Sequence, residues 1–178
     1  YVFPIVVAGA VIILTGLIDD VRELAPLPKI LGILFAALII WFFTDFHFDS
    51  FKIPFGGPLL VFPTWLAFCL TVLWIVAITN AINLIDGLDG LVAGVSIISL
   101  LTMGIVSYFF LYDSNIFLSL TIFVLVAAIA GFLPYNYHPA IIYLGDTGAL
   151  FIGFMIGVFS LQGLKNSTAV AVVTPIII

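Results

Sequence analysis

Charged side chains are scarce in this sequence: four residues are Lys or Arg and nine are Asp or Glu, together 7% of 178 residues. A soluble domain is nearer a quarter charged, because polar side chains must cover its core. This composition, with a mean hydropathy of +1.42, excludes a soluble globular protein. The apolar stretches run on for roughly 17–22 residues, whereas a membrane β-strand alternates over ~10 residues. We therefore predict an all-α, polytopic transmembrane protein.

Signals for disulfide chemistry and for export are missing as well. The single cysteine, Cys69, lies inside an apolar run and indicates nothing about the redox compartment. No initiator Met and no basic stretch precede the first apolar run, so no secretory signal is visible. The last run stops at "VVTPIII". We read the sequence as an internal segment of a longer chain and expect residues 1–178 to form one transmembrane domain.

Hydropathy divides the chain into seven apolar segments, each able to cross a membrane as a helix. Only the connection from Thr44 to Pro63 is long. It places three phenylalanines among polar residues ahead of a Pro/Gly cluster, which suits an interfacial hairpin or loop. The segments lie at roughly 2–18, 27–43, 62–81, 91–111, 116–134, 147–163 and 168–178, the last one incomplete.

The acidic residues divide unevenly between the two sides of the membrane. If every segment spans, one side holds the connections at 19–26, 82–90 and 135–146, and the other holds those at 44–61, 112–115 and 164–167. Six of the nine acidic residues then fall on the first side, in three clusters that can converge on one site. Each side carries two Lys or Arg residues, so the positive-inside rule does not orient the chain.

The first acidic cluster is "GLIDDVREL", Gly16 to Leu24. Consecutive helical residues point about 100° apart, so Asp19 and Asp20 cannot face one ligand in the same way. One can hold a metal or substrate while a second partner orients the other. The alternative is a membrane helix whose charged end simply anchors it in water.

The second cluster lies in "TNAINLIDGLDGLVAG". Its glycines allow tight turns and a close approach of the backbone to a ligand. Asn80, Asn83, Asp86 and Asp89 are spaced by three, which aligns them along one face if the segment is helical. The alternative is a polar turn, against which the repeated spacing of four amide or carboxylate groups argues.

The third cluster is "GFLPYNYHPAIIYLGDTGALFIGF". Asp146 precedes an apolar helix, so it is either a simple N-cap or a site residue beside a helix N-terminus that favours phosphate. Asn136 is either a polar contact in a pocket or a neighbour of interfacial tyrosines. His138, before a proline, is interpreted as a structural histidine rather than a metal ligand.

The three clusters together are rich in oxygen donors, free of sulfur and almost free of histidine. Such a set suits a hard cation, Mg²⁺ or Mn²⁺, rather than zinc. Mg²⁺ among a few carboxylates usually neutralises a phosphate-bearing substrate. The residues alone therefore predict a metal-dependent phosphoryl-transfer site at the membrane surface.

The three motifs, in this order, resemble the polyprenyl-phosphate N-acetylhexosamine-1-phosphate transferases of glycosyltransferase family 4. The resemblance covers nearly the whole chain, and "NLIDGLDGL" is close to diagnostic. The residues around Ile85 and Thr147 are similar to those of the branch that starts teichoic acid and O-antigen (lipopolysaccharide) chains. That branch implies UDP-GlcNAc as the donor. The alternative is the UDP-MurNAc-pentapeptide phosphotransferase branch, which makes lipid I.

The resemblance also implies roles for individual residues. Asp146 matches the principal Mg²⁺ ligand. Asp19, Asp20 and Asp86 match catalytic carboxylates near the lipid phosphate and the diphosphate, and the resemblance leaves open which of them is the general base. The substrate-binding matches are Asn83 near the diphosphate, and Asp89, Asn136 and Tyr143 around the uridine.

These matches imply a catalytic domain that transfers GlcNAc-1-phosphate from UDP-GlcNAc to undecaprenyl phosphate and releases UMP, with Mg²⁺ or Mn²⁺ as cofactor. They imply a bacterial plasma-membrane protein with its acid-rich loops in the cytoplasm, no nucleic-acid partner, and room for a homodimer. The family's earlier helices and later His-rich loop are absent from these residues.

Two rival functions fit the sequence less well. A cation transporter or channel would place its acids near mid-span, whereas these acids lie at segment ends. A CDP-alcohol phosphotransferase would carry a longer Asp-rich motif with an Arg, which is not found around Asp86.

Overall fold

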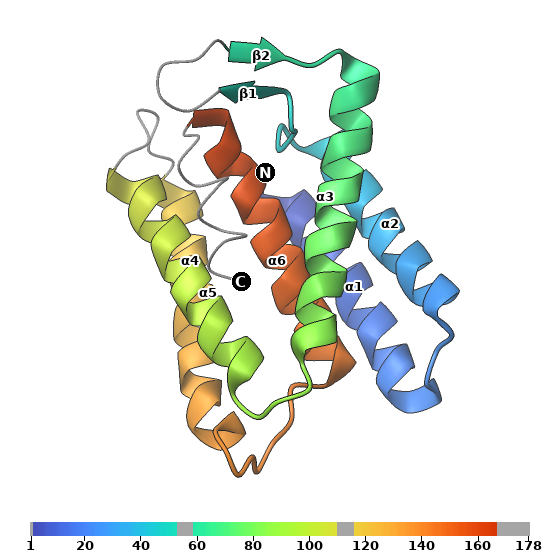
Figure 1. Cartoon of the computed structure of the whole chain (residues 1–178), viewed down its shortest axis with the longest axis vertical. Helices are drawn as coiled ribbons and strands as arrows, with labels where there is room; N and C mark the ends of the chain where they lie inside the picture. Colours follow the sequence, from blue (N-terminus) through green and yellow to red (C-terminus); the bar gives the residue numbers. More distant parts are fainter. Residues whose placement is uncertain (1, 53–58, 110–115, 167–178) are drawn as a thin grey trace.

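The computed structural model describes residues 2–52, 59–109 and 116–166. Within these ranges the chain forms a bundle of helices with one small hairpin (Figure 1). The elements are α1 (Val2–Arg22), α2 (Pro26–Phe43), β1 (Ser50–Lys52), β2 (Leu59–Val61), α3 (Thr64–Ile85), α4 (Leu91–Phe109), α5 (Ile116–Asn136) and α6 (Gly145–Asn166).

The predicted all-α, multi-pass architecture is confirmed. The five helices α1 to α5 are long and apolar enough to cross a membrane, and α6 is apolar over Gly145–Leu161. The first six predicted segments each correspond to one of these helices. The seventh, at 168–178, lies outside the described residues, as does the end of the fourth at 110–111.

The predicted ends of two helices were too early. The segments predicted to stop at 18 and 81 continue as helices to Arg22 and Ile85. Hydropathy falls where polar residues begin, but helical backbone hydrogen bonds form regardless of side-chain polarity. The extra turn places Asp19, Asp20 and Asn83 on rigid helix ends rather than in loops.

Helix α6 is the central helix of the bundle and packs against α1, α3 and α4 (Figure 1). Its residues from Ala149 to Leu161 are nearly all buried, as expected for a helix that is apolar on every side. A Cβ at Gly153 would lie 3.0 Å from the Cα of Thr79, so the missing side chain lets α3 approach closely. The indole of Trp74 on α3 donates to Ser160 Oγ at 2.8 Å, which adds a polar tie within the bundle.

The long connection forms the expected hairpin. Strands β1 and β2 pair antiparallel, with Ser50 opposite Val61, and the residues 53–58 between them lie outside the described ranges. The backbone N–H of Phe48 donates to Thr71 Oγ1 at 2.9 Å, which fastens the approach to the hairpin against α3.

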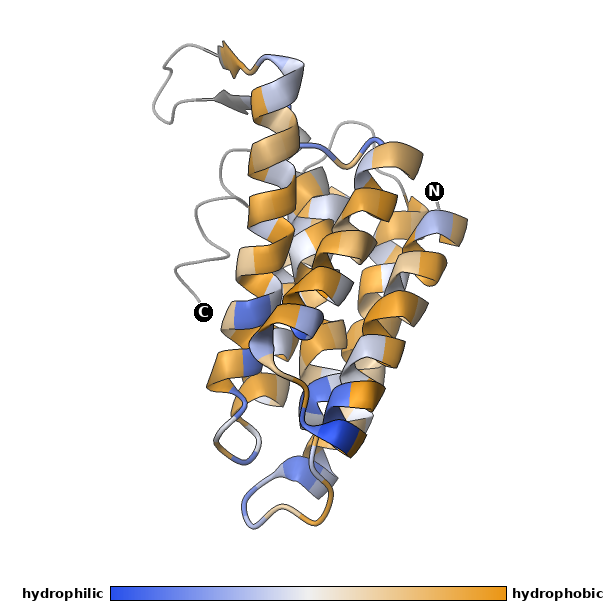
Figure 2. Cartoon of the chain, turned by 90° about the vertical axis from the view of Figure 1, so that its right-hand side faces the viewer, coloured by the Kyte–Doolittle hydropathy of each residue, from blue (hydrophilic) through white to orange (hydrophobic). Residues whose placement is uncertain are grey.

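The opposite end of the bundle collects three connections. The α1–α2, α3–α4 and α5–α6 connections all lie at the lower end in Figure 1. Hydrophilic residues concentrate there, below an apolar body (Figure 2). The predicted sharing of one side by these three connections is therefore confirmed, and their acidic residues can meet.

Candidate active site

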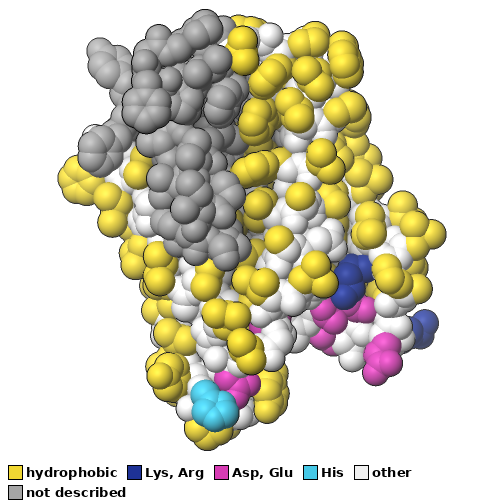
Figure 3. Space-filling model, viewed as in Figure 1, with side chains coloured by type: hydrophobic (Ala, Val, Ile, Leu, Met, Phe, Trp, Pro, Cys, Tyr) yellow, Lys and Arg dark blue, Asp and Glu magenta, His cyan; other side chains and the backbone are white. Residues whose placement is uncertain are grey.

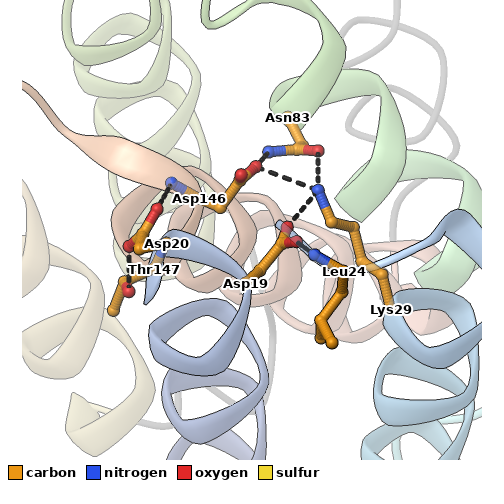
Figure 4. Close-up of polar contacts among 7 residues, drawn as sticks. All are labelled: Asp19, Asp20, Leu24, Lys29, Asn83, Asp146 and Thr147. Carbon is orange, nitrogen blue, oxygen red and sulfur yellow. Dashed lines mark hydrogen bonds and ion pairs between the residues drawn. The ribbon is translucent and has the colours of Figure 1, made fainter. Parts of the chain in front are cut away.

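Four polar side chains from four helices meet at this end (Figure 4). The Lys29 ammonium of α2 forms an ion pair with Asp19 of α1 and a second one, at 3.1 Å, with Asp146 Oδ1 of α6. It also donates to Asn83 Oδ1 of α3 at 3.4 Å. Asn83 Nδ2 in turn donates to Asp146 Oδ1. We call Asp19, Asn83 and Asp146, whose oxygens surround the Lys29 ammonium, the oxygen cluster.

Asp19 is the most deeply buried member of the oxygen cluster, with 4% of its surface exposed. A buried carboxylate needs close partners to offset its lost hydration. Besides Lys29, Asp19 Oδ1 accepts from the backbone N–H of Leu24 at 2.7 Å. The chain between them turns at Glu23, whose φ is +47°. This turn folds the chain back over Asp19 and leads into α2, which carries Lys29.

Asp20 faces a different partner, the start of α6. Its two carboxylate oxygens accept from the backbone N–H of Asp146 at 2.7 Å and of Thr147 at 3.1 Å. The Thr147 hydroxyl donates to it as well. Asp20 thus caps a helix to which it does not belong, which suits a negative charge. The prediction that Asp19 and Asp20 turn to different partners is confirmed.

Two glycines make this cap possible. A Cβ on Gly16, one turn before Asp20, would lie 2.4 Å from Thr147 Cα, so α1 reaches the α6 backbone only without a side chain there. Gly145 has φ +66°, and its Cβ would lie 3.1 Å from the Asp20 oxygens. Both positions require glycine for close approach, and Gly145 also for its left-handed backbone.

The position of Asp146 separates two sequence hypotheses. Asp20 supplies the cap of α6, while the Asp146 carboxylate points to Lys29 and Asn83 (Figure 4). A simple N-cap role therefore does not describe Asp146. Its carboxylate belongs to the oxygen cluster.

Asp86 follows directly after α3 and is half-buried. Burial, and then the negative charges of Asp146 and Asp20, raise the pKa of the Asp86 carboxyl above its usual value. The predicted convergence of the three clusters is found in the contacts of Asp19, Asn83 and Asp146, because each cluster contributes one of these residues.

Asp89 and Asn136 lie in a second group of contacts, which we call the loop latch. Asp89 Oδ2 accepts from the backbone N–H of Ala140 at 3.1 Å and contacts His138 Nδ1 at 3.0 Å. Asn136, 5% exposed, accepts from Gly90 N at 3.1 Å and donates to the carbonyl of Ile142 at the same distance. The latch fastens the α3–α4 turn to the α5–α6 loop.

The loop latch carries a pH prediction. The N–H of Ala140, and then His138, hold the pKa of the Asp89 carboxyl below its usual value. A lowered folded-state pKa gives stability that is complete above the unfolded-state pKa near ~4 and is lost as the pH falls through the folded value. We expect Asp89→Asn to lower the melting temperature at neutral pH, and the difference from wild type to shrink below about pH 4. A difference that does not change with pH would contradict this account.

Two sequence expectations about this region need correction or extension. The Asn80, Asn83, Asp86 and Asp89 series does not share one helix face, because α3 ends at Ile85 and the two aspartates lie beyond it. The glycines that follow favour a turn over further helix. Tyr143, on the α5–α6 loop, is 72% exposed, which leaves its ring open to a stacking partner.

Lys29 was missed by the sequence prediction. Its charge was counted only for membrane orientation, although basic residues are so rare here that one beside three acidic clusters was itself a signal. Figure 3 shows that the acidic and basic side chains visible on this face lie at its lower end.

The oxygen cluster fits a hard cation in its chemistry. Its donors are two carboxylates and an amide oxygen, the ligand types that Mg²⁺ and Mn²⁺ prefer. The Lys29 ammonium is a stand-in cation that all three oxygens already face. Across the described ranges, no three Asp, Glu, His or Cys side chains are arranged to hold a metal. The third oxygen of this cluster comes from Asn83 instead.

The sequence matches known proteins over most of its length. The family described as Glycosyl transferase family 4 matches residues 2–164. The chain is 45% identical over 98% of its length to a probable undecaprenyl-phosphate N-acetylglucosaminyl 1-phosphate transferase of Bacillus subtilis, of which it covers 48%. It is 38% identical over 88% of its length to a decaprenyl-phosphate N-acetylglucosaminephosphotransferase of Mycolicibacterium smegmatis, covering 40% of it. It is 36% identical over 70% of its length to a phospho-N-acetylmuramoyl-pentapeptide-transferase of Listeria innocua, covering 39%. The chain thus spans about half the length of these relatives or less.

Proposed function

Because the chain belongs to glycosyl transferase family 4, we propose that it transfers GlcNAc-1-phosphate from UDP-GlcNAc to undecaprenyl phosphate and releases UMP. The observation that carries this proposal is the meeting of two carboxylates and an amide from three helices around the Lys29 ammonium of a fourth, at one end of an apolar bundle. A lipid phosphate and a water-soluble nucleotide sugar can both reach such a place.

The names of the relatives support the donor. Identity is 45% with the relative named for N-acetylglucosaminyl 1-phosphate and 36% with the one named for phospho-N-acetylmuramoyl-pentapeptide. Lipid I synthesis is the second candidate function.

The reaction is a displacement at phosphorus. An oxygen of the lipid phosphate attacks the phosphorus that carries the sugar, the new P–O bond forms in line, and the bond to UMP breaks as UMP leaves with its electron pair. A Mg²⁺ ion held by Asp146, with Asp19 and Asn83, would supply charge neutralisation for the diphosphate when bound.

We take Asp86 as the candidate general base of this proposal. Asp19 and Asp20 are held by backbone N–H groups and by Lys29 or Thr147. Asp86 is half-buried, and its raised pKa brings it closer to the working pH of a general base. In this proposal the loop latch and Tyr143 border the part of the site that binds uridine. The end of the bundle that carries the site faces the cytoplasm.

A donor assay tests the function. The complete product of the gene, purified in detergent, should release UMP from UDP-GlcNAc when both undecaprenyl phosphate and Mg²⁺ are present. It should release none when the lipid is left out. The relatives' identities lead us to expect at least about tenfold faster release from UDP-GlcNAc than from UDP-MurNAc-pentapeptide.

The outcomes of this assay separate the candidates. Release from the pentapeptide nucleotide alone would move the protein to lipid I synthesis. No release from either donor, by protein that is folded by its thermal transition, would refute the proposed transferase.

A further inference from the structure

The Lys29 ammonium occupies the position where oxygens of Asp19, Asn83 and Asp146 converge. It forms an ion pair with each carboxylate, at 3.1 Å for Asp146, and its side chain is only 18% exposed. It lies near the start of α2, while the oxygens come from α1, α3 and α6. The following argument rests on the proposed function, which places a divalent cation at these same oxygens.

The ammonium and a divalent cation cannot share this position. Mg²⁺ binds oxygens at about 2.0–2.1 Å, so Asp146 and Asp19 would have to close around it more tightly than around an ammonium. The two positive centres would then lie on the order of 3 Å apart in a partly buried site, where their repulsion is only weakly screened. Two carboxylates balance one divalent ion, and nothing in the oxygen cluster balances an ammonium in addition.

The Lys29 side chain can move its ammonium out of the oxygen cluster. Its charge sits on a flexible four-carbon stem. The cluster lies at helix ends rather than at mid-span, with Asp19 and Asn83 in the last turns of α1 and α3 and Asp146 at the start of α6.

We propose that Lys29 and the divalent cation exclude each other: the ammonium neutralises the oxygen cluster until the metal binds, and metal binding then expels it from Asp146. Lys29 is thus a positioning residue that sets the metal affinity of the site.

Metal affinity provides the first test. In the complete gene product, Mn²⁺ binding without substrate is measured by the loss of the free-ion electron paramagnetic resonance signal. Lys29→Met should bind Mn²⁺ roughly tenfold more tightly than wild type or better, because a competing cation is gone. The matched control is Arg22→Met, which removes the same charge from the exposed end of α1 and should change the affinity by less than about twofold. An unchanged or weaker affinity in Lys29→Met would overturn the exchange.

Amine reactivity of the unaltered protein provides the second test, which does not depend on a variant folding. Brief acetylation with acetic anhydride is followed by mass spectrometry, with Lys52 and Lys165 as internal references. Adding Mg²⁺ should raise acetylation of Lys29 at least about threefold relative to the references, because an amine that leaves the oxygen cluster, where its side chain is 18% exposed, becomes more accessible to the reagent. Acetylation of Lys29 that stays constant or falls would refute the proposal.

The same samples separate this inference from the proposed function. If the wild-type protein binds no Mn²⁺ and releases no UMP, both the proposed function and the proposed exchange of Lys29 with the metal are refuted. The other case is a wild-type protein that is active and loses Mn²⁺ binding in the Asp146→Asn variant. If Lys29 acetylation then does not respond to Mg²⁺, only the proposed exchange of Lys29 with the metal is refuted.

Discussion

Replacing Asp146 with Asn is expected to lower UMP release roughly 10³-fold or more at saturating Mg²⁺. The change removes one of the two negative charges of the oxygen cluster, with almost no change in side-chain size. Charge stabilisation by a metal in phosphoryl transfer amounts to several kcal/mol, and each ~1.4 kcal/mol is tenfold in rate. UMP release by the complete gene product measures the effect directly.

Stability should hold in the same variant. Asp20, not Asp146, caps α6, and Lys29 keeps its ion pair with Asp19. The matched control is Asp45→Asn, the same chemical change at an exposed position beyond α2, which should leave UMP release unchanged. An Asp146→Asn protein that keeps more than about a tenth of wild-type turnover would show that the metal ligand is assigned to the wrong residue.

Gly16→Ala is expected to disrupt the site from a distance. The added Cβ would meet the α6 backbone, 2.4 Å from Thr147 Cα, and backbone cannot rotate aside as a side chain can. Overpacking of this kind costs about 1–3 kcal/mol, which corresponds to several degrees in melting temperature for a chain of this size. Because α1 must move away from α6, Asp20 loses its hold on the α6 N-terminus. A shift of about 1 Å in such a site can cost ~100-fold in rate.

Gly94→Ala is the matched control for this prediction. Gly94 lies in α4, and a Cβ there meets nothing within 4 Å. Alanine is the better helix former by about 1 kcal/mol, so this variant should be as stable as wild type or more so, with unchanged UMP release. Equal effects of the two substitutions on melting temperature and turnover would show that the α1–α6 contact is not as close as described.

Most of the architecture was predictable because a bilayer requires long apolar segments, which are visible in the sequence. Apolar runs long enough to cross a bilayer located six helices, and alternation of their connections put the acidic clusters on one side. The resemblance to the family pointed to every residue of the oxygen cluster, but not to Lys29. Hydropathy could not show where α1 and α3 end, since their last turns are polar, and those turns carry Asp19 and Asn83.

Other features depend on contacts that no local pattern encodes. The pairing of Lys29 with Asp146 joins residues 117 positions apart, and the capping of α6 by Asp20 joins residues 126 positions apart. Asp89 and Asn136 were predicted to hold a uridine, which stays a prediction, and in the fold they hold two loops together. That structural contribution of the loop latch appears only when both loops are placed, because His138 and Ala140 come from the partner loop.

The cap on α6 has a consequence for biogenesis. During synthesis α1 reaches the membrane long before α6. Asp20 then lies at the bilayer surface without the α6 N–H groups that it binds in the finished fold. Insertion of α6 then supplies both the N–H groups that Asp20 binds and the carboxylate that completes the oxygen cluster. Assembly of the active site is therefore tied to the arrival of the central helix. A nascent chain halted before α6 would leave Asp20 without its backbone partners and would expose the faces of α1, α3 and α4 that pack on α6, whereas Asp19 would already have Lys29 and the N–H of Leu24.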